Sequence, residues 1–296
     1  MTAKPVFHRS WLFAPGDSER KLQKVLDAGA DAVIIDLEDA VAPERKSLAR
    51  EMVVDFLRGP ARAAPCTVYV RINPWGDDVS AADVDSVMRA APSGLVQPKA
   101  ESAQDVIALH SALLALEKEH GMTPGSTSIL PIVTETARAV FNIGSYSVGV
   151  PRLTGLTWGA EDLGAAIGAS DRRDAHGEWL APFEMARSLT LMAAHAAGVE
   201  AIDTLHADFR DHDGLVAHAT RARRLGFTGK LAIHPAQVDP IHRAFTPTSD
   251  EVDHARAVVA AFEASPEAGA VALDGRMLDR PHLEGARKTL ALLREG

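Results

Sequence analysis

The chain has 296 residues, of which 46% are hydrophobic and 24% are charged. This is the composition of an ordinary globular enzyme rather than of a disordered or coiled chain. The formal net charge of −9 argues against a general nucleic-acid binder or a binder of anionic membranes, because either needs a broad basic face. An anionic ligand must therefore meet a local basic patch.

The single cysteine and the first residues bear on the compartment. Cys66 has no second thiol with which to form an intramolecular disulfide, and we interpret it as core filler. Residues 1–16 contain no apolar segment long enough for a secretory signal, and no apolar stretch approaches the roughly 20 residues of a membrane span. We therefore expect a cytoplasmic protein without a nucleic-acid or membrane partner.

Eight short apolar runs recur along the chain, and each ends in a charged or otherwise special residue. Strands that are buried on both faces read as continuous apolar runs, and stretches of helical periodicity lie between these runs. Eight such units predict an α/β protein, a (β/α)8 TIM barrel. The runs are residues 10–16, 32–39, 67–73, 94–99, 128–136, 153–162, 200–205 and 230–235.

The segments between the runs carry helix start and stop signals. After the first run, Asp17 or Ser18 is placed to cap a helix, and Gly29 is placed to end it. The segment 42–57 has Pro43 at a helix-starting position and apolar residues at helical spacing. Each pair of strand and helix therefore reads as one βα unit.

The residues after the eighth run exceed what a barrel needs. We assign residues 1–240 to a catalytic barrel and residues 241–296 to a helical extension. Residues 246–265 predict a capped amphipathic helix, and the small-residue stretch 267–275 predicts a flexible link to a second helix. We expect this extension to pack on or over a neighbouring subunit's active site.

Charged residues follow most of the predicted strands. In a (β/α)8 barrel the loops after the strands build the active site, so these residues should meet on one rim. A single charged residue after a strand is often only a solvated loop residue. Three acidic strand ends and one arginine on the same rim favour a functional site instead. The candidates are Asp36, Glu38, Asp39, Arg71, Lys99, Glu135, Glu161, Asp162, Asp203 and His234.

Glu135 and Asp162 end the fifth and sixth runs, so their carboxylates should be neighbours. Two carboxylates with waters and substrate oxygens are a usual way to hold Mg²⁺. The alternative is a general acid and base pair in which mutual repulsion raises one pKa. Without a cysteine or histidine beside them, zinc is disfavoured.

Arg71 ends the third run, where its guanidinium faces the rim. It is placed to grip a carboxylate or a developing oxyanion, or to form a structural bridge with Asp36 or Glu38, and both roles can hold together. The acidic triplet Asp36, Glu38 and Asp39 needs a nearby cation because like charges repel. We expect at least one of the three to order Arg71 or a metal-bound water.

Signatures of other chemistries do not occur in the sequence. There is no nucleophile elbow, no P-loop and no dinucleotide fingerprint. The polar segment 206–214 mixes histidine and aspartate without a fixed ligand spacing, and we interpret it as a solvated loop after a strand rather than a metal site.

Six motifs in fixed order resemble one family. They are RSWLFAPGDSERKLQKVLDAGADAVIIDLEDAVAPERK, VRINPWG, VQPKAES, IVTET, LTWGAEDL and GKLAIHPAQV. Together they resemble the citrate lyase beta subunit and malyl-CoA lyase family, which is HpcH/HpaI aldolase-like, from about residue 9 to the C-terminus. The resemblance implies a Mg²⁺-dependent barrel enzyme, with Mn²⁺ as an alternative ion, that makes or breaks a carbon–carbon bond next to a thioester without a covalent intermediate.

The resemblance also implies roles for individual residues. Glu135 and Asp162 match the metal carboxylates, and Arg71 matches the arginine that contacts substrate and the thioester enolate. Asp279 matches an acid/base residue that reaches a neighbouring subunit's site, although by sequence alone it is a helix N-cap. Substrate binding is assigned to Arg71, Glu135, Glu38, Asp39 and Glu161, and coenzyme A binding to Phe13, Lys24, Ile233 and His234.

One position departs from the family pattern. Ser18 stands where the family has a basic residue, and Arg20 of the same predicted helix is a substitute for the contact with the nucleotide phosphate. This departure leaves the phosphate contact open.

The predicted activity is a carbon–carbon lyase. The substrate is a short 3-hydroxy-dicarboxylic acyl-CoA of the malyl, citramalyl or citryl type, and the products are acetyl-CoA or a homologue and a 2-oxo acid. The alternatives are a malyl-CoA-type thioesterase and a citrate lyase beta subunit that acts on a carrier-protein thioester. The role of Asp279 implies a homo-oligomer, either a trimer or a hexamer.

Overall fold

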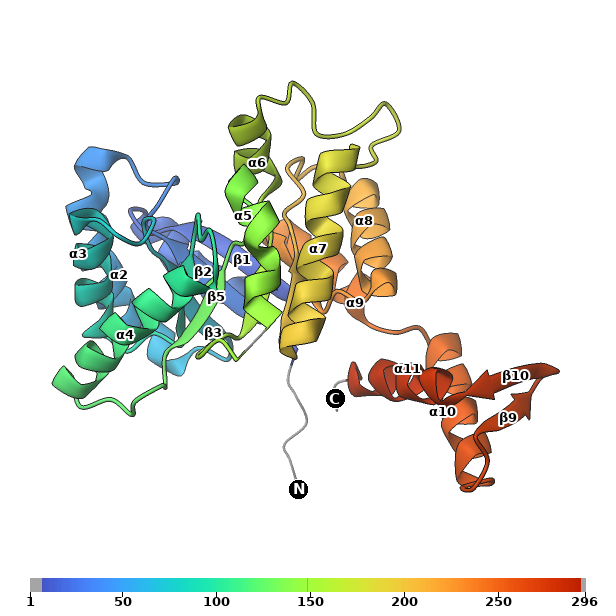
Figure 1. Cartoon of the computed structure of the whole chain (residues 1–296). Helices are drawn as coiled ribbons and strands as arrows, with labels where there is room; N and C mark the ends of the chain where they lie inside the picture. Colours follow the sequence, from blue (N-terminus) through green and yellow to red (C-terminus); the bar gives the residue numbers. More distant parts are fainter. Residues whose placement is uncertain (1–6, 148, 294–296) are drawn as a thin grey trace.

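The computed structural model describes residues 7–147 and 149–293 (Figure 1). All eight predicted strands are present, and each ends within its predicted run. Each strand therefore stops before or at the polar residues that close the run. The strands are β1 Ser10–Pro15, β2 Ala32–Asp36, β3 Thr67–Arg71, β4 Gly94–Gln97, β5 Ser128–Pro131, β6 Gly155–Thr157, β7 Glu200–Asp203 and β8 Gly229–Ala232.

The eight strands form one parallel sheet that curves into a barrel. Their order is β5-β4-β3-β2-β1-β8-β7-β6, so β5 and β6 are the two edges. Parallel bridges join these edges, from Ile129 to Leu153 and from Ile132 to Thr157, and the Val133 amide donates to the Thr157 carbonyl at 2.9 Å. The prediction of a (β/α)8 barrel is confirmed.

Helices surround the barrel, and their bounds follow the predicted start and stop signals. Ser18 occupies the N-cap position of the first helix, and Gly29 ends that unit with a left-handed φ of 70°. Pro43 begins a 3-10 turn that leads into the second helix. The helices are α1 Glu19–Val25, α2 Lys46–Arg58, α3 Asp78–Met88, α4 Ala103–Glu119, α5 Ala137–Asn142, α6 Ala160–Ile167, α7 Ala181–Ala197, α8 His212–Leu225 and α9 Val238–Phe245.

Two apolar layers hold the barrel together. The inner layer fills the barrel and includes Trp11 and Tyr69, whose rings meet edge to face with centroids 4.9 Å apart. The outer layer lies between the strands and the helices and is the larger of the two. Every residue of β2 is buried, as expected for a strand that faces both layers.

The C-terminal extension contains α10 (Ser249–Glu263), β9 (Ala270–Leu273), β10 (Arg276–Asp279) and α11 (Arg280–Ala291). The expectation of a flexible link is wrong, because β9 and β10 pair as an antiparallel hairpin. Its two-residue turn, Asp274-Gly275, has positive φ at both positions, which this dipeptide favours.

The extension projects from the barrel and has a small apolar core of its own (Figure 1). Val258 and Phe262 of α10 pack there with Leu283 of α11. The preceding helix, α9, packs against β1 and β8 of the barrel. The division of the chain at residue 240 stays a prediction.

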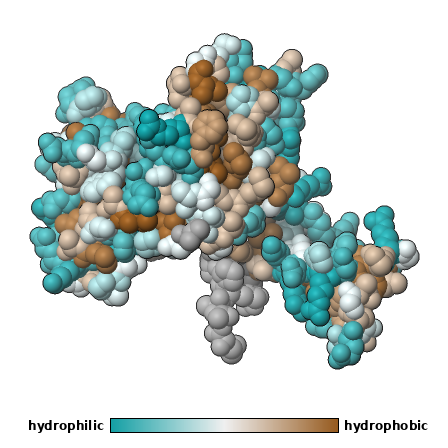
Figure 2. Space-filling view, viewed as in Figure 1, coloured by the Kyte–Doolittle hydropathy of each residue, from teal (hydrophilic) through white to brown (hydrophobic). Residues whose placement is uncertain are grey.

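Hydrophobic side chains gather on one face of the surface, over α5, α6 and α7 (Figure 2). Phe141 of α5 is 89% exposed, and Met185 and Met192 of α7 are more than half exposed. Within the described ranges, no helix has the length and apolar character needed to cross a membrane. The cytoplasmic location stays a prediction.

Candidate active site

Arg71 and Asp36 form a two-pronged ion pair where β2 and β3 end. The two residues are partners in the strand register, which sets their side chains next to each other. Arg71 donates from Nε to Asp36 Oδ1 at 2.7 Å and from Nη2 to Oδ2 at 2.6 Å. Asp36 also accepts from the amides of Glu38 and Ala40 at 2.9 and 3.0 Å. Both oxygens of Asp36 are thus paired, and Asp36 fixes the orientation of Arg71. This is the bridge between Arg71 and Asp36 that the sequence offered as one alternative.

Arg71 remains a cation in this setting. Its Nη1 lies 2.9 Å from Glu38 Oε2, and its guanidinium lies over the Phe13 ring at 5.0 Å from the centroid. Burial opposes the charge, but the hydrogen bonds and negative charge of Asp36 and Glu38 hold the pKa of Arg71 above its ordinary value. The group is therefore a fixed positive charge on the rim.

Lys99 connects the acidic residues of the rim. Its Nζ lies 2.5 Å from Glu38 Oε1, 3.7 Å from Asp162 Oδ1 and 3.8 Å from Asp39 Oδ2. Its backbone has a left-handed φ of 51°, and its amide donates to Glu135 Oε2 at 2.5 Å. A non-glycine residue rarely adopts this conformation, and such strain is concentrated at functional sites.

The sequence placed Lys99 on the rim but assigned it no role. Only its position at the end of the fourth run signalled it. The structure brings Lys99 together with the predicted residues Glu38, Asp39, Glu135 and Asp162.

Glu135 is a buried carboxyl group with few hydrogen-bond donors around it. It is 3% exposed, and its one hydrogen bond comes from the Lys99 amide, counted over the residues that the structure describes. Burial, with the nearby charges of Glu38 and Asp162, raises the pKa of Glu135 to about 8. A carboxyl group with so few donors gives up its proton at neutral pH only beside a cation.

Gly159 lets the backbone after β6 pass close to the Glu135 side chain. A Cβ at Gly159 would lie 2.8 Å from Glu135 Cγ, so only glycine allows the backbone this close. The Gly159 amide donates to Thr134 Oγ1 at 3.1 Å, and α6 begins immediately after it. Asp162 on the first turn of α6 is thereby brought to the same side of the rim as Glu135, and its charge is one of those acting on Glu135.

The donor set fits a hard divalent cation. Glu135 and Asp162 offer carboxylate oxygens, and one of them is buried and nearly unpaired. No group of three or more His, Cys, Asp and Glu suited to a metal occurs in residues 7–147 and 149–293. Two protein carboxylates with water and substrate oxygens are what Mg²⁺ commonly accepts, so the residues fit this ion.

The residues predicted for coenzyme A come from one side of the barrel. Phe13 belongs to β1, Lys24 is exposed on α1, and Ile233 and His234 follow β8, which pairs with β1. The His234 ring stacks on Phe209 with centroids 4.8 Å apart. Phe13, Ile233 and His234 therefore come from adjoining strands, whereas Lys24 lies in the last turn of α1.

Asp279 lies in the extension, outside the rim of its own barrel. It is the N-cap of α11, and its Oδ1 lies 2.5 Å from His282 Nδ1. The N-cap position read from the sequence is confirmed. The structure does not bring Asp279 to the other candidate residues of the same chain.

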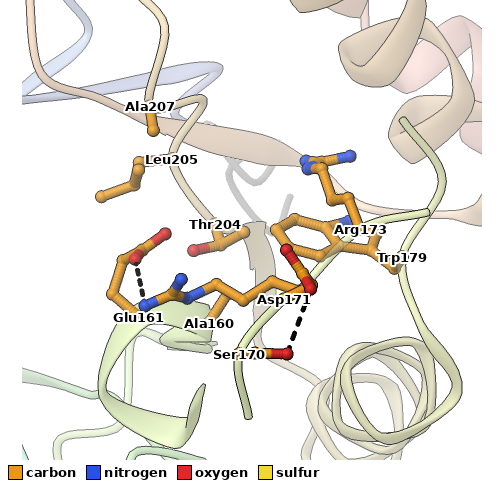
Figure 3. A pocket seen from close by; sticks show the side chains of 10 residues that line it. Ala160, Glu161, Ser170, Asp171, Arg173, Trp179, Thr204, Leu205 and Ala207 are labelled. Atoms are coloured by element: carbon orange, nitrogen blue, oxygen red, sulfur yellow. Dashed lines mark hydrogen bonds and ion pairs between the residues drawn. The ribbon is translucent and has the colours of Figure 1, made fainter. Parts of the chain in front are cut away.

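Two rim candidates have other surroundings. Asp203 is buried and accepts from Trp158, Arg187 and Lys230 at 2.9 to 3.3 Å, so it forms a closed interior network. Glu161 pairs with Arg172 at 2.8 Å and lines a cavity of about 290 Å³ between α6 and the segment after β7 (Figure 3). The sequence did not anticipate this cavity.

The first residue of the segment 206–214, His206, is not exposed to solvent. His206 is buried, its Nε2 lies 3.1 Å from Asp211 Oδ2, and its Nδ1 lies 3.3 Å from His218 Nδ1. The expectation of a solvated loop is wrong for His206, because contacts with α8 enclose it.

A closed (β/α)8 barrel with charged side chains where its strands end has the architecture of a barrel enzyme. A family model described as HpcH/HpaI aldolase/citrate lyase matches residues 9–235, and the chain belongs to this family. The predictions that the chain is an enzyme of the lyase type and that it has this family resemblance are confirmed.

Individual relatives match over nearly the whole chain. The citrate lyase subunit beta of Escherichia coli K12 is 35% identical over 96% of this chain and 92% of that protein. A (3S)-malyl-CoA thioesterase of Cereibacter sphaeroides KD131 is 33% identical over 96% and 93%. A crystal structure of CitE from Mycobacterium tuberculosis with magnesium, acetoacetate and coenzyme A has a TM-score of 0.81 at 34% identity, covering 97% of this chain and 98% of that one. The magnesium and coenzyme A in that relative agree with the predicted cofactors.

Proposed function

We propose that this protein is a Mg²⁺-dependent carbon–carbon lyase for a short 3-hydroxy-dicarboxylic acyl-CoA of the malyl, citramalyl or citryl type. The observation that carries the proposal is Glu135, a buried carboxylate with one hydrogen bond, beside Asp162 and the fixed cation Arg71. Cleavage gives acetyl-CoA or a homologue and a 2-oxo acid. The reverse reaction is a condensation.

Glu135 and Asp162 hold the metal ion, which is Mg²⁺ with Mn²⁺ as an alternative. When bound, the ion supplies Lewis-acid chemistry to the hydroxyl and carboxylate oxygens of the substrate. Lys99 steadies both carboxylates, because its amide binds Glu135 and its ammonium lies near Asp162. The same ammonium fixes Glu38 and Asp39 on the substrate side of the rim.

Arg71 stabilises the negative charge that develops on the thioester. The carbon–carbon bond breaks between the hydroxyl-bearing carbon and the carbon next to the thioester, and its electron pair forms the thioester enolate. The hydroxyl passes its proton to the carboxylate of Asp279 from a neighbouring subunit as it becomes the 2-oxo group, so the same group holds the proton that the enolate later needs. Asp36 holds Arg71 in one orientation before the reaction, so little reorganisation is needed when the charge appears.

Asp279 of a neighbouring subunit delivers the proton that converts the enolate to the acyl-CoA product. The projection of the extension from its own barrel supports this arrangement (Figure 1). The exposed hydrophobic side chains over α5, α6 and α7 support contact between subunits (Figure 2). A trimer, or a hexamer made of two trimers, closes such contacts.

Phe13, Lys24, Ile233 and His234 bind the coenzyme A part of the thioester. The position of Phe13 on β1 and of Ile233 and His234 directly after β8, two adjoining strands, supports a single binding surface for three of them, and Lys24 lies on α1, the helix that follows β1. Phe13 also lies against Arg71, so this surface begins at the reacting end.

The test is incubation of the protein and Mg²⁺ with malyl-CoA, citramalyl-CoA and citryl-CoA, with measurement of the 2-oxo acid and of free thiol. Oxo acid without thiol is the expected result. Thiol without oxo acid would establish a thioesterase, a second candidate that the 33% identity to a malyl-CoA thioesterase favours. No product from any of the three would leave a carrier-protein thioester as the substrate and overturn the coenzyme A proposal.

A further inference from the structure

Asp279 and His282 form a close pair where α11 begins. Asp279 is the last residue of β10 and the N-cap of α11, and His282 is the third residue of that helix. Asp279 Oδ1 lies 2.5 Å from His282 Nδ1. Two atoms that present only lone pairs would repel each other at this distance, so a proton lies between them. The two side chains therefore act as one unit.

Helix capping alone does not explain this contact. In a capping box the third helical residue accepts the N-cap amide, and the Asp279 amide nitrogen lies 3.2 Å from His282 Nδ1. Nδ1 carries either a hydrogen or a lone pair, so it cannot accept from the amide and donate to the carboxylate at the same time. The contact with the carboxylate is the shorter one and involves a charge. With Asp279 ionised, Nδ1 therefore carries the hydrogen and donates it to Oδ1.

The backbone on both sides of the pair is fixed in the small apolar core of the extension. Leu278 directly precedes Asp279, Leu283 directly follows His282, and the two leucines are 6% and 9% exposed in that core. The hairpin also pairs Asp279 with Ala270 of β9. The pair is therefore held by rigid elements, which keeps its geometry well defined.

The pair is nevertheless open to a neighbouring molecule. The side chains of Asp279 and His282 are 48% and 53% exposed, and the extension that carries them projects from the barrel (Figure 1). His282 also lines a cavity of about 460 Å³, in which Arg223 and Glu251 pair with each other at 2.9 Å. In residues 7–147 and 149–293 no side chain other than His282 pairs with Asp279. Asp279 Oδ2 therefore has no side-chain partner, and a carboxylate oxygen in this state can take up a proton.

We propose that His282 is a positioning residue for proton transfer by Asp279. The inference rests on the proposed function, in which Asp279 acts in a neighbouring subunit's site. In cleavage, Oδ2 takes the proton of the substrate hydroxyl and then passes it to the enolate carbon, while the Nδ1–H of His282 stays on Oδ1 throughout. His282 thus sets which oxygen exchanges the proton and the direction in which that oxygen points.

The test compares two amide variants, His282→Gln and His282→Asn. Glutamine at the third helical position keeps the capping box through its oxygen but loses the donor held against Oδ1, whereas the shorter asparagine carries its NH2 group in the place of Nδ1. The measured quantities are kcat and KM with whichever of malyl-CoA, citramalyl-CoA and citryl-CoA the unaltered protein cleaves. We expect His282→Gln to lower kcat by about tenfold to a hundredfold with KM changed less than about twofold, and His282→Asn to stay within about threefold in kcat.

Three further measurements separate positioning from a structural role. In the Asp279→Asn background, His282→Gln should cause no further loss of the residual activity, because the two residues act as one unit. The urea midpoint and Mg²⁺ binding by calorimetry should be the same for His282→Gln and the unaltered protein. His254→Gln, which changes an exposed histidine of α10 on the same cavity, is the matched control and should leave kcat and KM unchanged.

Equal kcat values for His282→Gln and His282→Asn would overturn the proposal, because a donor in the place of Nδ1 would then not matter. A further loss from His282→Gln in the Asp279→Asn background would overturn it as well, because His282 would act independently of Asp279. Failure of the proposed function has a different signature. In that case the unaltered protein cleaves none of the three thioesters, or Asp279→Asn keeps full activity.

Discussion

Two buried carboxylates of the barrel, Glu135 and Asp203, have opposite electrostatic states. Burial raises the pKa of Glu135 to about 8, whereas Lys230 and Arg187 outweigh burial and lower the pKa of Asp203 to about 2. Both side chains are nearly inaccessible to water. Burial by itself therefore does not distinguish them.

The number of partners makes the difference. Asp203 accepts from Trp158 Nε1 at 2.9 Å, from Arg187 Nε at 3.1 Å and from Lys230 Nζ at 3.1 Å. Glu135 accepts from one backbone amide. Asp203 is satisfied by the protein alone and serves the fold, whereas Glu135 still needs a cation and is the better candidate for chemistry.

Glu135→Gln gives the largest expected effect. An amide cannot supply the charged oxygen, so Mg²⁺ binding measured by calorimetry should be lost, and activity should fall by about a thousandfold or more. The free energy of unfolding without metal, measured with urea at pH 7, should stay equal or rise, because the Glu135 carboxyl must take up a proton to be buried and an amide need not. Glu119→Gln on the exposed end of α4 is the control. A large loss of stability would place Glu135 in the same structural class as Asp203.

Asp203→Asn should lower the stability of the protein and leave its activity almost unchanged. It leaves Lys230 and Arg187 buried without their counter-ion, so the free energy of unfolding should fall by about 3–5 kcal/mol. The activity per folded molecule should change little, and Asp208→Asn in the exposed loop nearby is the control. Loss of activity with unchanged stability would contradict the assignment and return Asp203 to the candidate site residues.

The sequence predicted the barrel well because its signals are local. Continuous apolar runs mark strands that are buried on both faces, and the residues that end them lie on the rim. The pairing of Arg71 with Asp36 was one of the predicted arrangements, since neighbouring strands of a parallel sheet end at the same edge. The hairpin at residues 270–279 was missed, although Asp274-Gly275 between two apolar stretches is a hairpin signal.

The sequence assigned a role to Glu135 and not to Asp203, but it placed both on the rim and did not predict that Asp203 belongs to an interior network. Both residues end apolar runs. The partners of Asp203 come from α7 and β8, which are distant in the sequence and reach Asp203 only in the folded chain. Lys99 received no role for a similar reason, because its amide and its ammonium serve residues from three other segments. Arg173 stacks on Trp179 through a loop conformation that no spacing rule describes.

A smaller and pH-dependent effect is expected from His218, which lies near the cations of the Asp203 network. Burial lowers the pKa of His218 to about 4, and Arg173, Lys230 and His206 act in the same direction. Asp203 opposes this shift, and Asp211 is paired with His206 next to it. In the unfolded chain an ordinary histidine has a pKa of about 6.5, so the unfolded state binds the proton more readily.

His218 should therefore contribute stability above about pH 6.5 that is lost as the pH falls towards 4. The side chain is partly exposed, so we expect only about 1 kcal/mol after screening by solvent. The measurement is urea unfolding at pH 7.5 and pH 5 for the unaltered protein and for His218→Gln. The variant should lose less stability between the two pH values, while His254→Gln on α10 should behave as the unaltered protein. Equal losses in all three proteins would show that His218 is not a source of this acid sensitivity, and that the cations around Asp203 tolerate one more charge.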